Sequence, residues 1–189
     1  MISVALQFLR DEVNSWLASR TGVPSTVVAL SRIVDENGKY AFSEDTVALS
    51  LVCFEEERVL RGQTPEYTLK GGQHVMNQPE LSVNLTVMFA SNHRNYDQAL
   101  KHLSFILTFF QAAARFTRES HPALDARVDR LLVELLTLTY EQQSHIWTIV
   151  GGKMLPNALY RVRLLPMRDD APVRVQPPVV EVQSTVQAG

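Results

Sequence analysis

The sequence predicts an α+β fold in which a mixed β-sheet of about five strands is packed by three main helices and followed by an extended C-terminal tail. A stripe of apolar residues at helical spacing opens the chain. Runs of alternating or β-branched residues follow, and two further helix signals are interleaved with them. The chain has 189 residues, of which 46% are hydrophobic, so it is long enough to bury one core.

Apolar spacings of three and four predict a first helix that ends near Thr21 and Gly22, before Pro24. Its stripe consists of Ile2, Ala5, Leu6, Leu9, Val13, Trp16 and Leu17. The segment Thr26–Val34 is rich in β-branched residues and is followed by the turn signal Asp35–Gly38. We therefore expect a strand there.

Three segments in the middle of the chain differ in period. Thr46–Phe54 is apolar at nearly every position, which predicts a central strand buried on both faces. From Glu55 to Glu80, charges, glycines and prolines occur without a sustained period, which predicts a long irregular loop. Leu81–Phe89 alternates apolar and mostly polar residues, so we expect a half-exposed strand after the loop.

A central helix packed on the sheet is predicted to start after the capping residue Asn95 and to reach Phe110. Phenylalanines crowd the second half of this segment, namely Phe105, Phe109, Phe110 and Phe116. They cannot all lie on one apolar stripe about 100° wide. Two interpretations are equally supported: a helix nearly surrounded by core, and a helix that shows apolar surface to another subunit.

The segment Leu131–Leu138 could by its period continue a helix begun at Leu124 or form a strand. Thr139–Gln142 has the pattern of a capping box that starts a short helix ending at Gly151, which favours a strand before it. Ala158–Leu165 predicts a last strand, stopped by Pro166.

Residues 1–167 are therefore expected to form one domain, and residues 168–189 a flexible or partner-ordered tail. The tail contains prolines and dispersed valines without a capped element. An extended segment of this kind can add to the edge of a partner's sheet.

The sequence contains no coherent set of catalytic, cofactor-binding or metal-binding residues. Its five histidines lack ligand spacing, and Cys53, the single cysteine, lies in a strand-like run and is expected in the core. No motif for a nucleotide or a nucleophile follows a predicted strand. The strongest enzymatic candidate is Glu55–Arg61, whose alternate carboxylates could act as acid and base or gather a cation, although a solvated strand end is the favoured interpretation.

Charge and hydropathy exclude some partners. The formal net charge is −2, and the arginines of the second half are interleaved with acids, which favours a solvated mixed-charge surface over a nucleic-acid site. The longest apolar stretch, Leu103–Ala114, is shorter than the roughly 20 residues of a membrane span. The N-terminus lacks the basic region of a secretion signal, so we expect the protein in the cytoplasm when it is made.

An ordered set of motifs runs through most of the chain: Phe8–Glu12, Gln78–Leu85, Asn95–Leu103, Phe109–Gln111, Val133–Leu135, Trp147 with Gly151, Leu155-Pro156 and Leu159–Arg163. In this order and spacing the sequence resembles the cap, or tail-terminator, proteins of extracellular contractile injection systems, the phage-tail-like particles of the antifeeding-prophage and virulence-cassette type. It departs from their pattern at Thr148–Val150 and at Asn157.

The resemblance implies a structural protein without cofactors, which forms a ring expected to be a hexamer. That ring would sit on the tube and sheath at the end distal to the baseplate and stop their polymerisation, contacting sheath and inner-tube subunits. The protein would then become part of the particle. Leu81–Phe89, Glu55–Glu80 and the tail are the candidate contact segments. The alternative is a small α+β enzyme or ligand-binding domain that uses Glu55–Arg61.

Overall fold

The computed structural model describes residues 1–22, 27–57, 66–70, 73–77, 81–167 and 174–176. These residues form three helices, which are α1 (Ile2–Thr21), α2 (Tyr96–Ala112) and α3 (Tyr140–Val150). Their strands are β1 (Val28–Leu30), β2 (Thr46–Glu56), β3 (Glu66–Lys70), β4 (Gln73–Asn77), β5 (Leu81–Asn92), β6 (Arg115–Thr117), β7 (Val128–Leu135), β8 (Asn157–Met167) and β9 (Arg174–Gln176).

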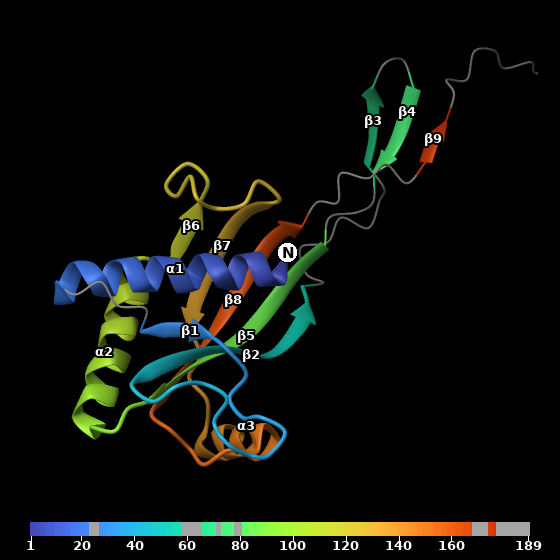
Figure 1. Ribbon diagram of the computed structural model, residues 1–189. Helices are drawn as coiled ribbons and strands as arrows, with labels where there is room; N and C mark the ends of the chain where they lie inside the picture. Colours follow the sequence, from blue (N-terminus) through green and yellow to red (C-terminus); the bar gives the residue numbers. More distant parts are fainter. Residues whose placement is uncertain (23–26, 58–65, 71–72, 78–80, 168–173, 177–189) are drawn as a thin grey trace, which may run out of the picture.

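The main sheet has six strands in the order β1-β2-β5-β8-β7-β6. Strand β1 runs parallel to β2, whereas all the other neighbours are antiparallel. The predicted α+β fold with a mixed sheet and three main helices is thereby confirmed. A second, three-stranded sheet of order β3-β4-β9 is drawn beyond the start of β5 and the end of β8 (Figure 1).

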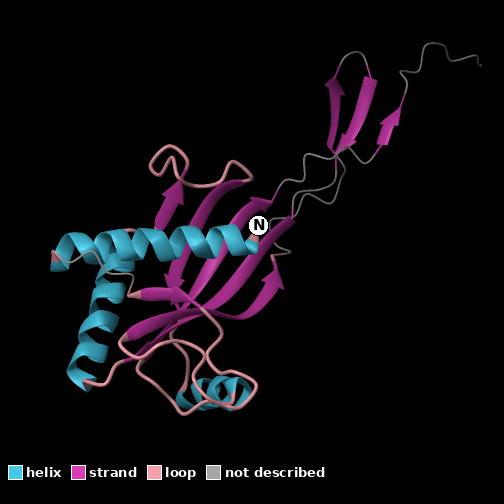
Figure 2. Cartoon of the chain, viewed as in Figure 1, coloured by secondary structure: helices cyan, strands magenta, loops and turns pink. Residues whose placement is uncertain are grey.

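The helices divide between the two faces of the six-stranded sheet. Helices α1 and α2 lie on one face of the sheet, where α1 crosses the strands (Figures 1 and 2). Helix α3 lies on the other face, near the end of β5 and the start of β8. On the α1 and α2 face, the alternate residues Val83, Leu85, Val87 and Phe89 of β5 enter the larger core. The ring of Phe110 packs there against Phe89 and Tyr160, with centroid distances of 5.6 and 4.7 Å.

The other face carries a smaller core under α3. Trp147 is its largest buried side chain, and it packs with Ala48, Met88, Ala90 and Leu159 of the central strands. Because α3 has 11 residues, it covers only part of the long strands β2, β5 and β8.

The predicted first and last helices are confirmed together with their caps. Helix α1 ends at Thr21, and Gly22 takes the left-handed conformation that caps it, with φ of 70°. At the start of α3, the side chain of Thr139 accepts a hydrogen bond from the Gln142 amide, and the Gln142 side chain accepts one from the Thr139 amide. Gly151 ends α3 with φ of 77°.

The central helix is also confirmed, but its end is not where the aromatic residues suggested. Helix α2 ends at Ala112, and Phe116 lies on β6 rather than on the helix. Phe109, Phe110 and Phe116 are all buried, and Phe105 packs against Trp16 of α1 with a centroid distance of 6.2 Å. The core interpretation of these phenylalanines is therefore correct. Phe116, which does not fit on the helical stripe, lies on strand β6 instead.

The prediction of a long irregular loop over Glu55–Glu80 is wrong. Strand β2 continues to Glu56, and β3 pairs with β4 in an antiparallel hairpin from Glu66↔Asn77 to Lys70↔Gln73. The two runs are separated in the sequence only by Gly71-Gly72, a pair typical of tight hairpin turns. This local pattern indicates a hairpin more directly than the charges and prolines around it indicate a loop.

Several strand boundaries differ from the prediction. Of Thr26–Val34, only Val28–Leu30 forms a strand, Val34 makes an isolated bridge with Tyr40, and Thr26 lies outside the described residues. Strand β7 begins three residues before Leu131. Strand β8 continues through Pro166 to Met167, because its register with β5 shifts between Leu81 and Val83, and an irregular position tolerates proline.

Within the tail, Arg174–Gln176 forms β9 and pairs with β4 of the same chain. We expected that such an extended segment can add to the edge of a partner's sheet. In the structure, the strand that β9 joins is β4 of the same chain. Residues 168–173 and 177–189 lie outside the described residues.

Candidate functional site

The acidic segment Glu55–Arg61 divides its described carboxylates between the two faces of the sheet, with Glu55 and Glu57 on the side of Asn84 and Glu56 on the other. Glu55 pairs with Asn84 and Glu56 with Val83, so their side chains leave opposite faces of the sheet. The carboxylate of Glu57 accepts a hydrogen bond of 2.9 Å from the side-chain amide of Asn84. Arg58–Arg61 lie outside the described residues. In the part that the structure describes, no three His, Cys, Asp or Glu side chains are placed to hold a metal ion.

The histidines take part in packing rather than in a common site. The rings of His93 and His102 stack with a centroid distance of 4.5 Å, and Nδ1 of His93 lies 3.0 Å from the hydroxyl of Ser91. Burial, and then the charge of His102, lower the pKa of His93, while Asp45 opposes this effect. His102 bonds to the Gln98 carbonyl, as expected of a structural imidazole, and His145 is exposed.

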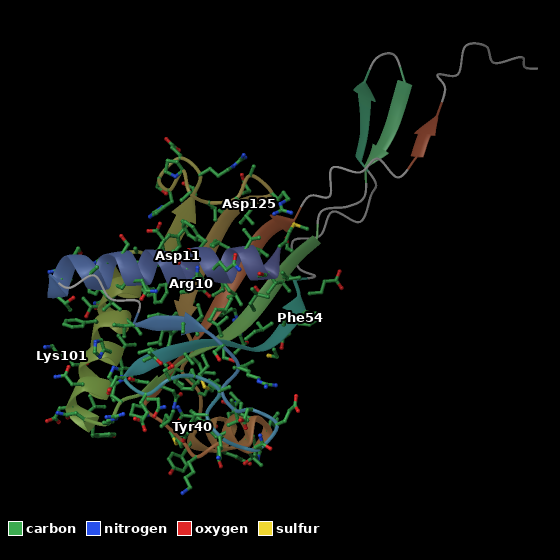
Figure 3. The ribbon with its side chains drawn as sticks, in the orientation of Figure 1. Arg10, Asp11, Tyr40, Phe54, Lys101 and Asp125 are labelled. Atoms are coloured by element: carbon green, nitrogen blue, oxygen red, sulfur yellow. The ribbon has the colours of Figure 1, made fainter. Side chains whose placement is uncertain are left out.

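The outer edge of β2 is the first surface suited to association. Strand β1 covers only Val47–Leu49, so among the described residues Leu51–Glu56 pair on one side alone, with β5. Leu51 and Phe54 are exposed by 36% and 63%. Figure 3 shows Phe54 at the end of β2, and the strand order puts β6 at the other side of the sheet. An uncovered edge with apolar side chains favours pairing with another chain.

This edge also corrects two expectations about β2. The strand is buried on both faces only in its first half, Val47–Ser50, whereas Cys53 is exposed rather than part of the core. A bulge between Leu51 and Cys53 separates the two halves. The strand is apolar throughout in composition, so its sequence does not indicate that the buried residues of the two cores lie in its first half only.

A shallow apolar groove lies at the other side of the sheet. It has a volume of about 310 Å³ and is lined by Leu107 of α2 and by Leu135, Leu136 and Leu138 at the end of β7. Leu107 and Leu135 are exposed by 37% and 54%. The groove and the β2 edge therefore give the subunit apolar surface on two different sides, as contacts between successive subunits of a ring require.

The third surface is the part of the α3-side face that α3 leaves uncovered, which we call the open face. Its side chains come from β2, β5, β6, β7 and β8, none is buried and none belongs to either core. They are Cys53, Glu55, Asn84, Thr86, Arg115, Thr117, Arg130, Leu132, Glu134, Arg161 and Arg163. The polar side of Leu81–Phe89, predicted to be half-exposed, is part of this face.

The open face brings together four of the arginines that the sequence had placed on a mixed-charge surface. Arg115 and Arg130 are exposed on β6 and β7, and Arg161 and Arg163 are half-exposed on β8. The alternation of Arg161 and Arg163 within one strand could have signalled their shared face. The positions of Arg115 and Arg130 could not be inferred, since they depend on the pairing of β6 with β7.

Comparisons with known proteins agree with this architecture. The family model described as the Pvc16 N-terminal domain matches residues 5–181. The fold is similar to the sheath/tube terminator of the extracellular contractile injection system PVC in the extended state, with a TM-score of 0.60 and 15% identity over 94% of this chain and 62% of that chain. It is also similar to the tube-terminating cap of the anti-feeding prophage, with a TM-score of 0.58 and 15% identity over 94% of this chain and 60% of that chain.

The chain thus spans about three fifths of the length of these two solved proteins. A sequence search of curated proteins gives no significant match. In the described part of the chain, no helix has the length and apolar character needed to cross a bilayer.

Proposed function

The chain belongs to the Pvc16 N-terminal domain family, and we propose that it is a structural cap subunit that terminates the tube, the sheath or both in a contractile injection system. The single observation that carries the proposal is the family match over residues 5–181. The shared fold of the PVC sheath/tube terminator and the anti-feeding prophage cap supports it.

The physical task of a terminator suits the surfaces of this chain. A stack of rings grows because each ring shows edges and patches that match the next, so a terminator must match on one face only. The β2 edge and the groove at Leu107 and Leu135 lie on different sides of the subunit and suit contacts around a ring. The open face is polar and suits a different neighbour.

Several finer features belong to the same proposal. The subunits form a homo-oligomeric ring, a hexamer, at the end distal to the baseplate, and contact sheath and inner-tube subunits. The protein is made in the cytoplasm and becomes part of the particle. Residues 1–167 are the tail-terminator-like domain, and residues 168–189 act as a contact arm.

The structure favours no enzymatic alternative. Of the described carboxylates of Glu55–Arg61, Glu56 leaves the face opposite to Glu55, and Glu57 accepts a hydrogen bond from Asn84. The role that we propose depends on shape and edge complementarity, and the proposal includes no cofactor.

Electron microscopy of particles assembled with and without this chain tests the proposal. Particles that lack the chain should have tubes or sheaths of irregular, increased length, because polymerisation is no longer stopped. Restoring the chain should restore one length. Tubes and sheaths of normal, uniform length without the chain would disprove the terminating role.

A further inference from the structure

We propose that the open face binds an extended acidic segment of a protein partner in the assembly, with carboxylates on alternate residues. The inference rests on the proposed function and names the chemistry of one of its partners. In Figure 1, α1 crosses in front of the sheet, so the open face is on the far side.

The first argument is the alignment of the polar residues across neighbouring strands. One row runs from Glu55 through Asn84, Arg163 and Leu132 to Arg115. The next row contains Cys53, Thr86, Arg161 and Glu134. Residues paired directly across a sheet lie on the same face, so both rows face the same neighbour.

The second argument is charge. On β6, β7 and β8, the open face carries four arginines, Arg115, Arg130, Arg161 and Arg163, and one carboxylate, Glu134. The only ion pair found between these described side chains joins Arg163 and Glu134, with an N–O distance of 3.9 Å. This side of the face therefore has an excess of positive charge that an acidic partner would complement.

The third argument is a pair of buried atoms without partners. Neither Nε of Arg163 nor Oδ1 of Asn84 has a hydrogen-bond partner among the described residues, although both atoms are buried. Glu57 accepts a hydrogen bond from the other end of the Asn84 amide and so orients it. A buried donor and acceptor that stay unsatisfied are costly, so these two side chains favour a contact that turns them outward, where a partner's carboxylate and amide groups can reach both atoms.

Spacing determines which acidic segment fits. Alternate residues of a strand are about 7 Å apart, so Arg161 and Arg163 present two guanidinium groups at roughly that separation. An extended segment has the same repeat, and glutamates at alternate positions can each meet one arginine. Guanidinium groups bind carboxylates through two parallel hydrogen bonds, which gives the contact a defined geometry.

A nucleic acid fits this face less well than an acidic peptide does. Grooves that bind single strands combine positive charge with aromatic side chains on which bases stack. Neither described row contains Phe, Tyr or Trp, so the face lacks the aromatic side chains on which bases would stack.

Binding of a labelled peptide with alternating glutamates to the full chain tests the proposal. The double variant R161Q/R163Q should weaken binding by about tenfold or more for each arginine, since hydrogen bonds to charged groups contribute about 1.5–3 kcal/mol. The matched control R20Q/R32Q removes the same charge from exposed arginines outside the open face and should change affinity less than about twofold. Thermal melting confirms that each variant is folded.

A second variant should act in the opposite direction. Glu134→Gln removes the carboxylate that competes for Arg163, so it should tighten binding of the acidic peptide. A peptide with glutamines in place of the glutamates should not bind. The proposal is overturned if the acidic peptide fails to bind, if R20Q/R32Q weakens binding as much as R161Q/R163Q, or if a single-stranded oligonucleotide of equal charge binds more tightly.

Particle assembly separates this inference from the proposed function. If R161Q/R163Q remains folded but leaves tubes or sheaths of irregular length, the open face is needed for docking. If particles with R161Q/R163Q have normal lengths while particles without the chain do not, the open face is not the docking surface and the terminating role stands. Normal lengths without the chain would instead disprove the terminating role.

Discussion

Two halves of one sheet face differ although they belong to the same strands. In the half under α3, Met88 of β5 and Leu159 of β8 are paired and buried beside Trp147. One row further along, Thr86 and Arg161 are paired on the same face but remain half-exposed. Both strands change from apolar to polar at the same row. The composition of a strand therefore indicates how far the helix packed on it extends, as well as which side of the strand faces the core.

The largest expected effect is in the covered half. Trp147→Ala should lower the free energy of unfolding by about 3–5 kcal/mol, because it removes the largest side chain of the smaller core and leaves a cavity. Chemical denaturation measures the change. His145→Ala, on an exposed position of the same helix, is the control and should cost less than about 0.5 kcal/mol. Similar losses for both variants would mean that α3 does not form a core at Trp147.

A smaller effect is expected from the cap of the covering helix. Thr139→Ala removes the side chain that accepts a hydrogen bond from the Gln142 amide and should cost about 1 kcal/mol of unfolding free energy. Thr139→Ser keeps the hydroxyl and should stay close to the parent protein in the same denaturation assay. If the alanine variant is as stable as the serine variant, the capping box does not hold α3 on the sheet.

Lowering the pH should reduce the stability of the fold through His93, which lies in neither half of this face. His93 follows β5, and its pKa is lowered in the folded protein by burial and by His102, so the unfolded chain binds this proton more readily. Stability should be retained above the unfolded pKa of about 6.5 and fall as the pH drops through it. We expect a modest change, because His93 is partly exposed and solvent screens its charge.

Melting temperatures between about pH 7.5 and pH 5.5 measure the contribution of His93. In His93→Gln the decline towards low pH should be smaller than in the parent protein. His145→Gln is the matched control, since that imidazole is exposed on α3, and it should keep the parent's pH dependence. An unchanged decline in His93→Gln would assign the acid sensitivity to other groups.

The smallest expected effect on stability is in the open half. R161Q/R163Q should change the free energy of unfolding by less than about 0.5 kcal/mol, since the only ion pair found there for Arg163 is long and exposed at Glu134. Such a result would sharpen the comparison between the two halves. The paired residues under α3 would then stabilise the fold, and the paired residues two positions further along the same strands would bind a partner. A loss as large as that of Trp147→Ala would show that the arginines are structural.

Much of the fold could be predicted because its signals are local. The stripe of α1, the caps at Asn95 and Thr139, and the alternation in β5 each depend on residues close together in the chain. Strand β6 escaped detection because three residues are too few to show a period. The β3–β4 hairpin had a local signal, Gly71-Gly72, within the segment for which an irregular loop was predicted.

The interaction surfaces could be predicted only in part. The expectation that polar residues of Leu81–Phe89 take part in contacts places Asn84 and Thr86 on the open face. The exposure of Phe54 could not be foreseen, because it depends on which elements pack over that end of β2. The arginines could be located in the sequence. Because acidic residues lie next to them along the chain, the sequence did not indicate that the arginines gather on one face apart from most of those acids.

The sequence by itself determined the three helices and their caps, five strands of the main sheet, the inward side of the central strands and the family resemblance. These depend on side-chain period and short-range hydrogen bonds, which a chain carries wherever it folds. Only the tertiary structure decided which strand edges stay uncovered, how far α3 extends over its face, and that Arg115 joins Arg163 in one row. These features depend on pairing between residues distant in sequence, where register and cover are set by the packing of the whole domain.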